Sequence, residues 1–242
     1  SKNKKKAVAK PLETPAIVVK DNLAQVEEQH NVIFKPNAGP QTDFLAAGER
    51  EVLYGGSAGG GKSYAMLADP LRFMGHPAFS GLLLRHTTEE LRELIFKSQE
   101  MYPKIWPGIK WSERKMQWTA PSGARLWMSY LDREDDVLRY QGLAFSWIGF
   151  DELTQWPTPF AWNYMRSRLR STAHDLPVYM RATTNPGGRG HHWVKKMFID
   201  PAPHNKSFDA TDIETTEVLK YPAGHKKAGK ALFKRKFIPA RL

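Results

Sequence analysis

A glycine-rich octapeptide, residues 56–63, has the residue types and spacing of a phosphate-binding loop. It matches the pattern G-x-x-x-x-G-K-[ST] in full. Glycines let the backbone curl around an anion, Lys62 can reach the β and γ phosphates, and Ser63 can bind Mg²⁺. A glycine-rich turn with an exposed lysine is the alternative, which the expected flanking strand 52–55 and helix 62–74 disfavour. The residues expected to bind a nucleoside triphosphate are Gly56, Ser57, Ala58, Gly59, Gly60, Gly61, Lys62 and Ser63.

Two adjacent carboxylates, Asp151 and Glu152, follow the apolar run 145–150. An aspartate at such a strand end in a P-loop protein faces the loop serine and holds Mg²⁺, commonly through water. A glutamate directly after it suits a general base that activates the attacking water. The pair could instead be two solvated carboxylates at the start of a loop, but its position after a buried-type strand and a complete phosphate loop favours catalysis.

The glutamate base and the absence of a guanine-binding motif indicate which nucleotide the chain binds. A glutamate beside the Mg²⁺ aspartate predicts hydrolysis coupled to mechanical work, whereas a switch GTPase positions water with glutamine. The sequence also has no Asn-Lys-x-Asp guanine signature, so we expect ATP. Upstream, the amide of Gln41 could pair with the adenine edge. The alternative for Gln41 is a helix-start residue in a surface loop.

Further polar groups are expected at the same edge of the sheet. Thr183, Thr184 and Asn185 end the strand expected at 177–184, where they could hydrogen-bond the γ phosphate or the attacking water. Taken alone, these residues could instead be the end of a strand that leaves through a Pro-Gly turn, a reading that the other two motifs disfavour.

Charge must be neutralised in the transition state of phosphoryl transfer, and an arginine typically does this. The sequence favours Arg139, which precedes the Asp-Glu strand, with Arg85 next. Arginines on helices are most often solvated, so the remaining candidates, Arg168 and Arg170, are weaker.

Composition excludes several kinds of site. The chain has no cysteine, which rules out disulfides and thiolate metal sites. Adjacent histidines on a helix point in different directions, so we expect packing or surface roles for His191 and His192. No apolar run approaches the length of a membrane span, and we expect a soluble protein without a membrane partner.

The net charge of +11 is concentrated at the two ends of the sequence. Five lysines lie in residues 1–10 and eight basic residues in 220–242, which leaves 23 basic and 25 acidic residues between them. Basic ends can bind a polyanion through counterion release, or they can be solvated tails, a linker or part of an expression sequence.

Strands alternating with helices predict an α/β fold, a three-layer P-loop NTPase of the additional-strand, catalytic-glutamate type. The central sheet should be mostly parallel. Residues 115–120 and 124–130 flank a Pro-Ser-Gly turn and predict an inserted β-hairpin.

The motifs together resemble one family, the large terminases of tailed bacteriophages. These are Gly-Pro-Gln, the phosphate loop, Leu-Arg-His-Thr at 84–87, Arg-Tyr-Gln-Gly at 139–142, Phe-Asp-Glu-Leu-Thr-Gln at 150–155, and the run from Ala182 to Trp193. The similarity covers about residues 34 to 240.

This resemblance implies an ATPase that pumps double-stranded DNA through a portal protein into a procapsid in the host cell cytoplasm. It implies a ring of about five subunits, with the single domain possible as a monomer, and a small terminase subunit as partner. It also implies Mg²⁺ at Asp151, a catalytic base at Glu152, adenine contact at Gln41, and coupling of hydrolysis to motion through Thr183, Thr184 and Asn185. The arginine can act within a subunit or from its neighbour.

The sequence differs from the family in one respect: family members carry a nuclease domain after the ATPase domain. We expect a basic, largely disordered extension at 1–30, an ATPase domain at 31–220, and a basic segment at 221–242 that leads toward an absent nuclease domain. Nuclease activity is not expected. Two other hypotheses are a helicase or recombination ATPase and a nucleotide-dependent structural module that binds ATP without productive hydrolysis.

Overall fold

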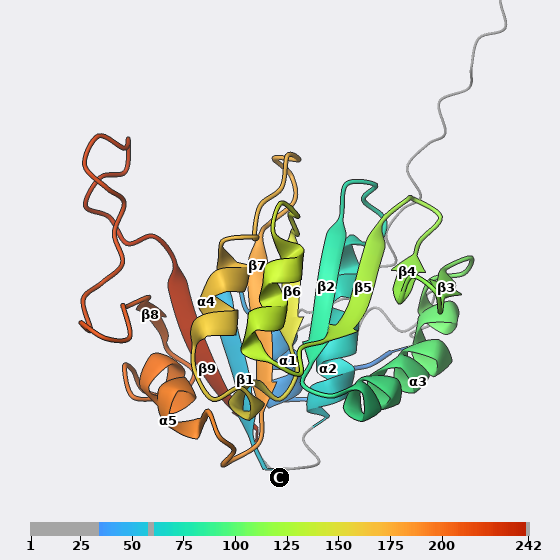
Figure 1. The fold of residues 1–242 in the computed structure, drawn as a ribbon, viewed down its shortest axis with the longest axis horizontal. Helices are drawn as coiled ribbons and strands as arrows, with labels where there is room; N and C mark the ends of the chain where they lie inside the picture. Colours follow the sequence, from blue (N-terminus) through green and yellow to red (C-terminus); the bar gives the residue numbers. More distant parts are fainter. Residues whose placement is uncertain (1–33, 58–60, 241–242) are drawn as a thin grey trace, which may run out of the picture.

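The computed structural model describes residues 34–57 and 61–240, in which nine strands form one sheet (Figure 1). The sheet order is β3-β4-β5-β2-β6-β7-β1-β9-β8. The strands are β1 Glu51–Gly56, β2 Ser80–Arg85, β3 Lys110–Ser112, β4 Gln117–Thr119, β5 Arg125–Tyr130, β6 Trp147–Phe150, β7 Tyr179–Thr184, β8 Ser207–Asp209 and β9 Lys234–Ala240. Six strands, from β5 across to β9, are parallel, which confirms the mostly parallel α/β sheet.

Helices cover both faces of this sheet (Figure 1). One core contains residues of α1 Pro40–Ala46, α2 Lys62–Ala68 and α3 Thr88–Ile105. The other contains residues of α4 Phe160–Arg166 and α5 His191–Val194. Successive strand residues point to opposite faces, so Val52 and Tyr54 of β1 join the first core while Leu53 joins the second.

The predicted hairpin is present, and its second strand belongs to the parallel sheet. β4 pairs antiparallel with β5, and β3 pairs antiparallel with β4. β5 in turn lies parallel to β2, with Arg85 opposite Tyr130. The hairpin therefore extends the sheet at one end.

Helix α2 is shorter than the predicted 62–74. It ends at Ala68 and continues as a 3₁₀ turn, Asp69–Phe73. Pro70 is the reason, because proline has no N–H to donate and its ring clashes with the preceding turn of an α-helix.

The boundary expected at residue 220 does not mark the end of the sheet. β9 lies beyond it and pairs in parallel with β1, from Glu51 opposite Arg235 to Gly56 opposite Ala240. The pattern of residues 234–240 indicated a strand, but its partner strand lies almost two hundred residues earlier, beyond the reach of local pattern. The extension expected at residues 1–30 lies outside the described residues.

Among the helices of the described part of the chain, none combines the length and the apolar character needed to cross a bilayer.

Candidate nucleotide site

The predicted site residues come from strand ends at one edge of the sheet. The phosphate loop follows β1, Asp151 follows β6, and Thr183 and Thr184 end β7. β7 lies between β6 and β1, and β2 lies on the other side of β6. Because these strands are parallel, the sheet order alone brings the loop and the carboxylates to a common edge.

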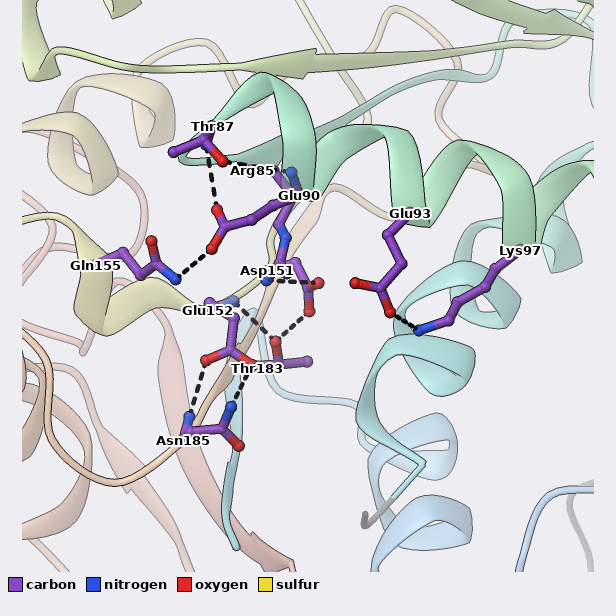
Figure 2. Close-up of polar contacts among 10 residues, drawn as sticks. All are labelled: Arg85, Thr87, Glu90, Glu93, Lys97, Asp151, Glu152, Gln155, Thr183 and Asn185. Atoms are coloured by element: carbon purple, nitrogen blue, oxygen red, sulfur yellow. Dashed lines mark hydrogen bonds and ion pairs between the residues drawn. The ribbon is translucent and has the colours of Figure 1, made fainter. Parts of the chain in front are cut away.

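Asp151 is buried beside a threonine and an arginine (Figure 2). The Thr183 hydroxyl donates a hydrogen bond to Oδ1, and Nη1 of Arg85 lies 3.2 Å from Oδ2. Burial raises the pKa of Asp151, and the charge of Arg85 opposes that rise. Within the described residues, Oδ2 of Asp151 and Nη1 of Arg85 form this ion pair but no hydrogen bond, and Nε of Arg85 is buried without a hydrogen-bond partner. A buried carboxylate beside a guanidinium offers an oxygen ligand for a hard cation and a donor for an anion, which fits Mg²⁺ and a phosphate group.

Glu152 is held by the neighbouring strand through both its backbone and its carboxylate. Its N–H donates to the Thr183 hydroxyl at 3.0 Å. Its carboxylate accepts from the N–H of Asn185 at 3.2 Å and from Nδ2 of Asn185 at 2.7 Å. Its φ of 61° lies in the left-handed region, which is uncommon for a residue other than glycine. Burial, and next the charge of Asp151, raise the pKa of Glu152.

Thr183 and Thr184 have different partners because successive strand residues point to opposite faces. Thr183 faces Asp151 and Glu152. Thr184 instead hydrogen-bonds the Thr154 hydroxyl at 2.9 Å, in the turn that follows Glu152. In this structure the Thr184 hydroxyl is therefore engaged inside the protein, and its contact with the nucleotide stays a prediction.

The ammonium of Lys62 folds back onto the start of the phosphate loop. Its Nζ donates to the carbonyl oxygens of Gly56 at 3.2 Å and Ser57 at 2.7 Å. Burial lowers the pKa of Lys62, while the charges of Glu152 and Asp151 act in the opposite direction. Ser63 is the second residue of α2. Ala58, Gly59 and Gly60 lie outside the described residues.

Gln41 supports the end of the loop. Its Nε2 donates to the Gly61 carbonyl at 2.9 Å, and its Oε1 accepts from the N–H of Asn37 at 2.6 Å. Both amide atoms are thus engaged, and the side chain is buried. A direct reading of adenine by Gln41 would require these bonds to break, so the structure does not place its amide free for a base.

Arg139, the arginine that the sequence favoured, lies outside the group of side chains around Asp151 and Glu152. Arg139 belongs to the 3₁₀ turn Glu134–Tyr140, donates to the Tyr130 carbonyl at 2.6 Å, and has a side chain that is 44% exposed. Arg85 is the arginine that contacts Asp151. Arg170 is exposed and Arg168 is half-buried.

Sequence reasoning missed two polar residues beside the site, Glu90 and Gln155. Nε2 of Gln155 donates to Glu90 at 2.8 Å, and Glu90 also caps the start of α3 through the N–H of Thr87 at 3.2 Å (Figure 2). Burial acts to raise the pKa of Glu90, but the Gln155 hydrogen bond and the charge of Arg85 hold it below its usual value. The Thr-x-x-Glu spacing at 87–90 is a capping-box signal that could have identified this helix start.

The loop after β7 packs tightly on the turn after Glu152. The N–H of Gly190 donates to the Thr154 carbonyl at 2.7 Å, and a Cβ on Gly190 would lie 2.1 Å from the Trp156 carbonyl oxygen. The indole of Trp193 donates to the same Trp156 oxygen at 2.9 Å. His191 and His192, which begin α5, are exposed.

The fold and the placement of these motifs are those of a P-loop ATP hydrolase. The family model "Terminase large subunit, T4likevirus-type, N-terminal" matches residues 53–233. The chain therefore belongs to this terminase family, and it is the ATPase domain of a viral DNA-packaging motor.

One of the solved structures that the chain matches supports the fold. The chain is similar to a point mutant of the large terminase ATPase domain of Thermus phage P74-26, with a TM-score of 0.54, 12% identity, and coverage of 86% of this chain and 82% of that chain. It also matches the large terminase of bacteriophage HK97, with a TM-score of 0.46, 15% identity, and coverage of 62% of this chain and 33% of that chain. A search of curated protein sequences returned no significant match.

Proposed function

We propose that this domain binds Mg·ATP at the carboxyl ends of β1 and β6, as a P-loop ATPase of the additional-strand, catalytic-glutamate type in three layers. The observation that carries this proposal is the buried Asp151–Arg85 ion pair, whose facing atoms make no hydrogen bond, at the edge where the phosphate loop begins. The backbone of residues 56–61 and the ammonium of Lys62 would hold the phosphates, while Ser63 and Asp151 would hold the metal. Mg²⁺, when bound, would neutralise phosphate charge and draw electron density from the γ phosphorus.

Glu152 is the base in this proposal. Its carboxylate takes a proton from a water molecule whose oxygen attacks the γ phosphorus, the bond to the β-phosphate oxygen breaks, and ADP and phosphate leave. Asn185 is a positioning residue, because its two hydrogen bonds fix the Glu152 carboxylate. Thr183 is another, since one hydroxyl contacts both Asp151 and the Glu152 backbone.

We further propose that hydrolysis drives translocation of double-stranded DNA through a portal protein into a procapsid in the host cytoplasm. A ring of about five copies and a small terminase subunit complete the motor. Loop 185–193 packs on the turn after Glu152, so a shift of Glu152 would move that loop as well. This packing supports the coupling of ATP hydrolysis to DNA movement. The ATPase domain then includes β9 and continues to about residue 240.

In this proposal Arg85 and Arg139 neutralise the charge of the transition state from different subunits. Arg85 neutralises charge within the chain, since it already lies in the site. Arg139 is exposed and contacts Tyr130, Asp136 and Tyr140, so it is placed to act on a neighbouring subunit.

This arrangement predicts that the ATP turnover rate per domain rises steeply with protein concentration, because the site is completed when subunits meet. Phosphate release should be measured over a hundredfold range of concentration in Mg²⁺, with EDTA as the blank. The Arg139→Ala domain should stay at the dilute wild-type rate throughout, and Arg85→Ala should fall below that rate at every concentration. A wild-type rate that is independent of concentration contradicts the role of Arg139. No Mg²⁺-dependent phosphate release at any concentration contradicts the proposed function.

A further inference from the structure

The structure separates the basic residues near the end of the chain into two groups. Those of β9 have acidic neighbours: Nζ of Lys234 lies 2.9 Å from Asp209, and Nε of Arg235 lies 2.7 Å from Glu51. Nζ of Lys236 lies 3.9 Å from a Glu49 oxygen. The charge of β9 is therefore compensated within the fold.

A second group lies on a projecting hairpin, residues 219–232, which we call the basic arm (Figure 1). Its lysines are exposed, have no ion pair within the described residues, and share the arm with no aspartate or glutamate: Lys220, Lys226, Lys227 and Lys230. The acidic residues that precede the arm lie in the turn 212–217, where the Asp212 carboxylate accepts from the N–H groups of Glu214 and Thr215. The arm thus carries most of the uncompensated positive charge of this end of the chain.

The arm is ordered by its own hydrogen bonds. Leu232 donates to the Leu219 carbonyl at 2.8 Å, and Tyr221 donates to the Lys230 carbonyl at 3.0 Å. The tip is folded by further backbone bonds, among them Gly229 to Tyr221 at 3.1 Å. A folded arm loses little conformational freedom when it binds, so its charges are preorganised.

We propose that the basic arm binds the phosphate backbone of double-stranded DNA. This inference rests on the proposed function, which supplies DNA as the polyanion. Lysines that contact phosphates bind through counterion release and do not read sequence. Single-stranded DNA would instead need free aromatic rings for base stacking. The one aromatic side chain of the arm, Tyr221, is already stacked on His225, with ring centroids 4.4 Å apart and planes at 10°.

The arm lies at the opposite edge of the sheet from the nucleotide. It joins the sheet at the amino end of β9, whereas the phosphate loop follows the carboxyl end of β1, and these strands are parallel. β9 connects the two edges directly, because Ala240 lies opposite Gly56. DNA held by the arm would therefore leave the nucleotide site open.

The test is DNA binding by the full 242-residue chain, followed by fluorescence anisotropy of a labelled duplex at several salt concentrations. The variant carries Lys226→Ala, Lys227→Ala and Lys230→Ala. Each lysine that contacts a phosphate contributes about 0.9 to the slope of log affinity against log salt, so the slope should fall by about 2 to 3. The affinity at low salt should fall at least about tenfold, equally for two duplexes of unrelated sequence.

A matched control carries Lys110→Ala, Arg114→Ala and Lys115→Ala, three exposed basic residues at the other end of the sheet. This control should bind DNA like the wild type. The proposal is overturned by unchanged affinity and salt slope in the arm variant, by an equal loss in the control, or by a wild type that binds no duplex at low salt. ATP hydrolysis without DNA, measured on the same samples, separates the two failures: a wrong function shows as absent hydrolysis, and a wrong arm shows as unchanged DNA binding with hydrolysis intact.

Discussion

Glu152→Gln is expected to lower the rate of ATP hydrolysis by at least about a hundredfold while nucleotide stays bound, because general-base catalysis contributes about 10²–10⁴-fold. Glutamine has nearly the same shape but cannot take a proton from water. Burial and the nearby charge of Asp151 raise the pKa of Glu152, which makes it a stronger base than an exposed glutamate. The measurement is phosphate release in a single-turnover assay, together with a titration of ATP.

The matched control is Glu93→Gln. Glu93 pairs with Lys97 at 2.6 Å on α3, its side chain is 62% exposed, and within the described residues it makes no hydrogen bond or ion pair with Asp151 or Glu152 (Figure 2). It should hydrolyse ATP at the wild-type rate. Hydrolysis by Glu152→Gln within a few-fold of the wild type would show that another group activates the water.

The second large effect is expected on the stability of the fold, when the buried ion cluster around Glu51 of β1 is disrupted. Glu51 accepts from Nε of Arg235 at 2.7 Å and from Nη2 of Arg166 at 3.3 Å. It is fully buried, and Arg235 is nearly so. Burial acts to raise the pKa of Glu51, but the charges and hydrogen bonds of Arg166 and Arg235 outweigh it and hold the pKa below its usual value. The cluster connects β1, α4 and β9.

Glu51→Ala should lower the free energy of unfolding by about 3–5 kcal/mol, because it leaves buried guanidinium groups without a partner. The control Asp209→Ala removes an exposed partner of Lys234 and should cost less than about 1 kcal/mol. Urea unfolding at neutral pH measures both. Equal effects of the two substitutions would contradict this account of the cluster.

The Glu51 cluster also predicts a direction for acid unfolding. The pKa of Glu51 is lower in the folded chain than in the unfolded chain, so the unfolded state takes up the proton first. Its contribution to stability is therefore complete above the unfolded pKa near 4.5 and is lost as the pH falls toward the lower folded value. Glu51→Gln should lack this part of the acid dependence.

The sequence predicted the parts of the site that depend on short spacing. The phosphate loop and the Asp-Glu pair each follow a strand in a local pattern, and parallel strands bring their ends together. It did not predict how side chains share partners across strands. Which of Thr183 and Thr184 faces Asp151 depends on the register of β7 against β6, and Gln41 is engaged by Asn37 and Gly61 through the approach of the chain before β1.

Long-range pairing limited the prediction of the fold in the same way. The strand at 234–240 could be read locally, but the buried contact of Arg235 with Glu51 joins residues 184 positions apart. The charge count of residues 220–242 likewise combined paired lysines with unpaired ones. Only the folded chain separates β9 from the basic arm.

The most direct test of the account is a calorimetric titration of Mg·ATP into the wild-type domain and into Lys62→Ala. The ammonium of Lys62, which lies against the carbonyls of Gly56 and Ser57, is expected to move onto the phosphates when nucleotide binds. We predict saturable binding by the wild type and at least about tenfold weaker binding by Lys62→Ala, since a desolvated charge pair is lost. Equal affinity of the two proteins, or no binding by the wild type, would contradict a nucleotide site at this edge of the sheet.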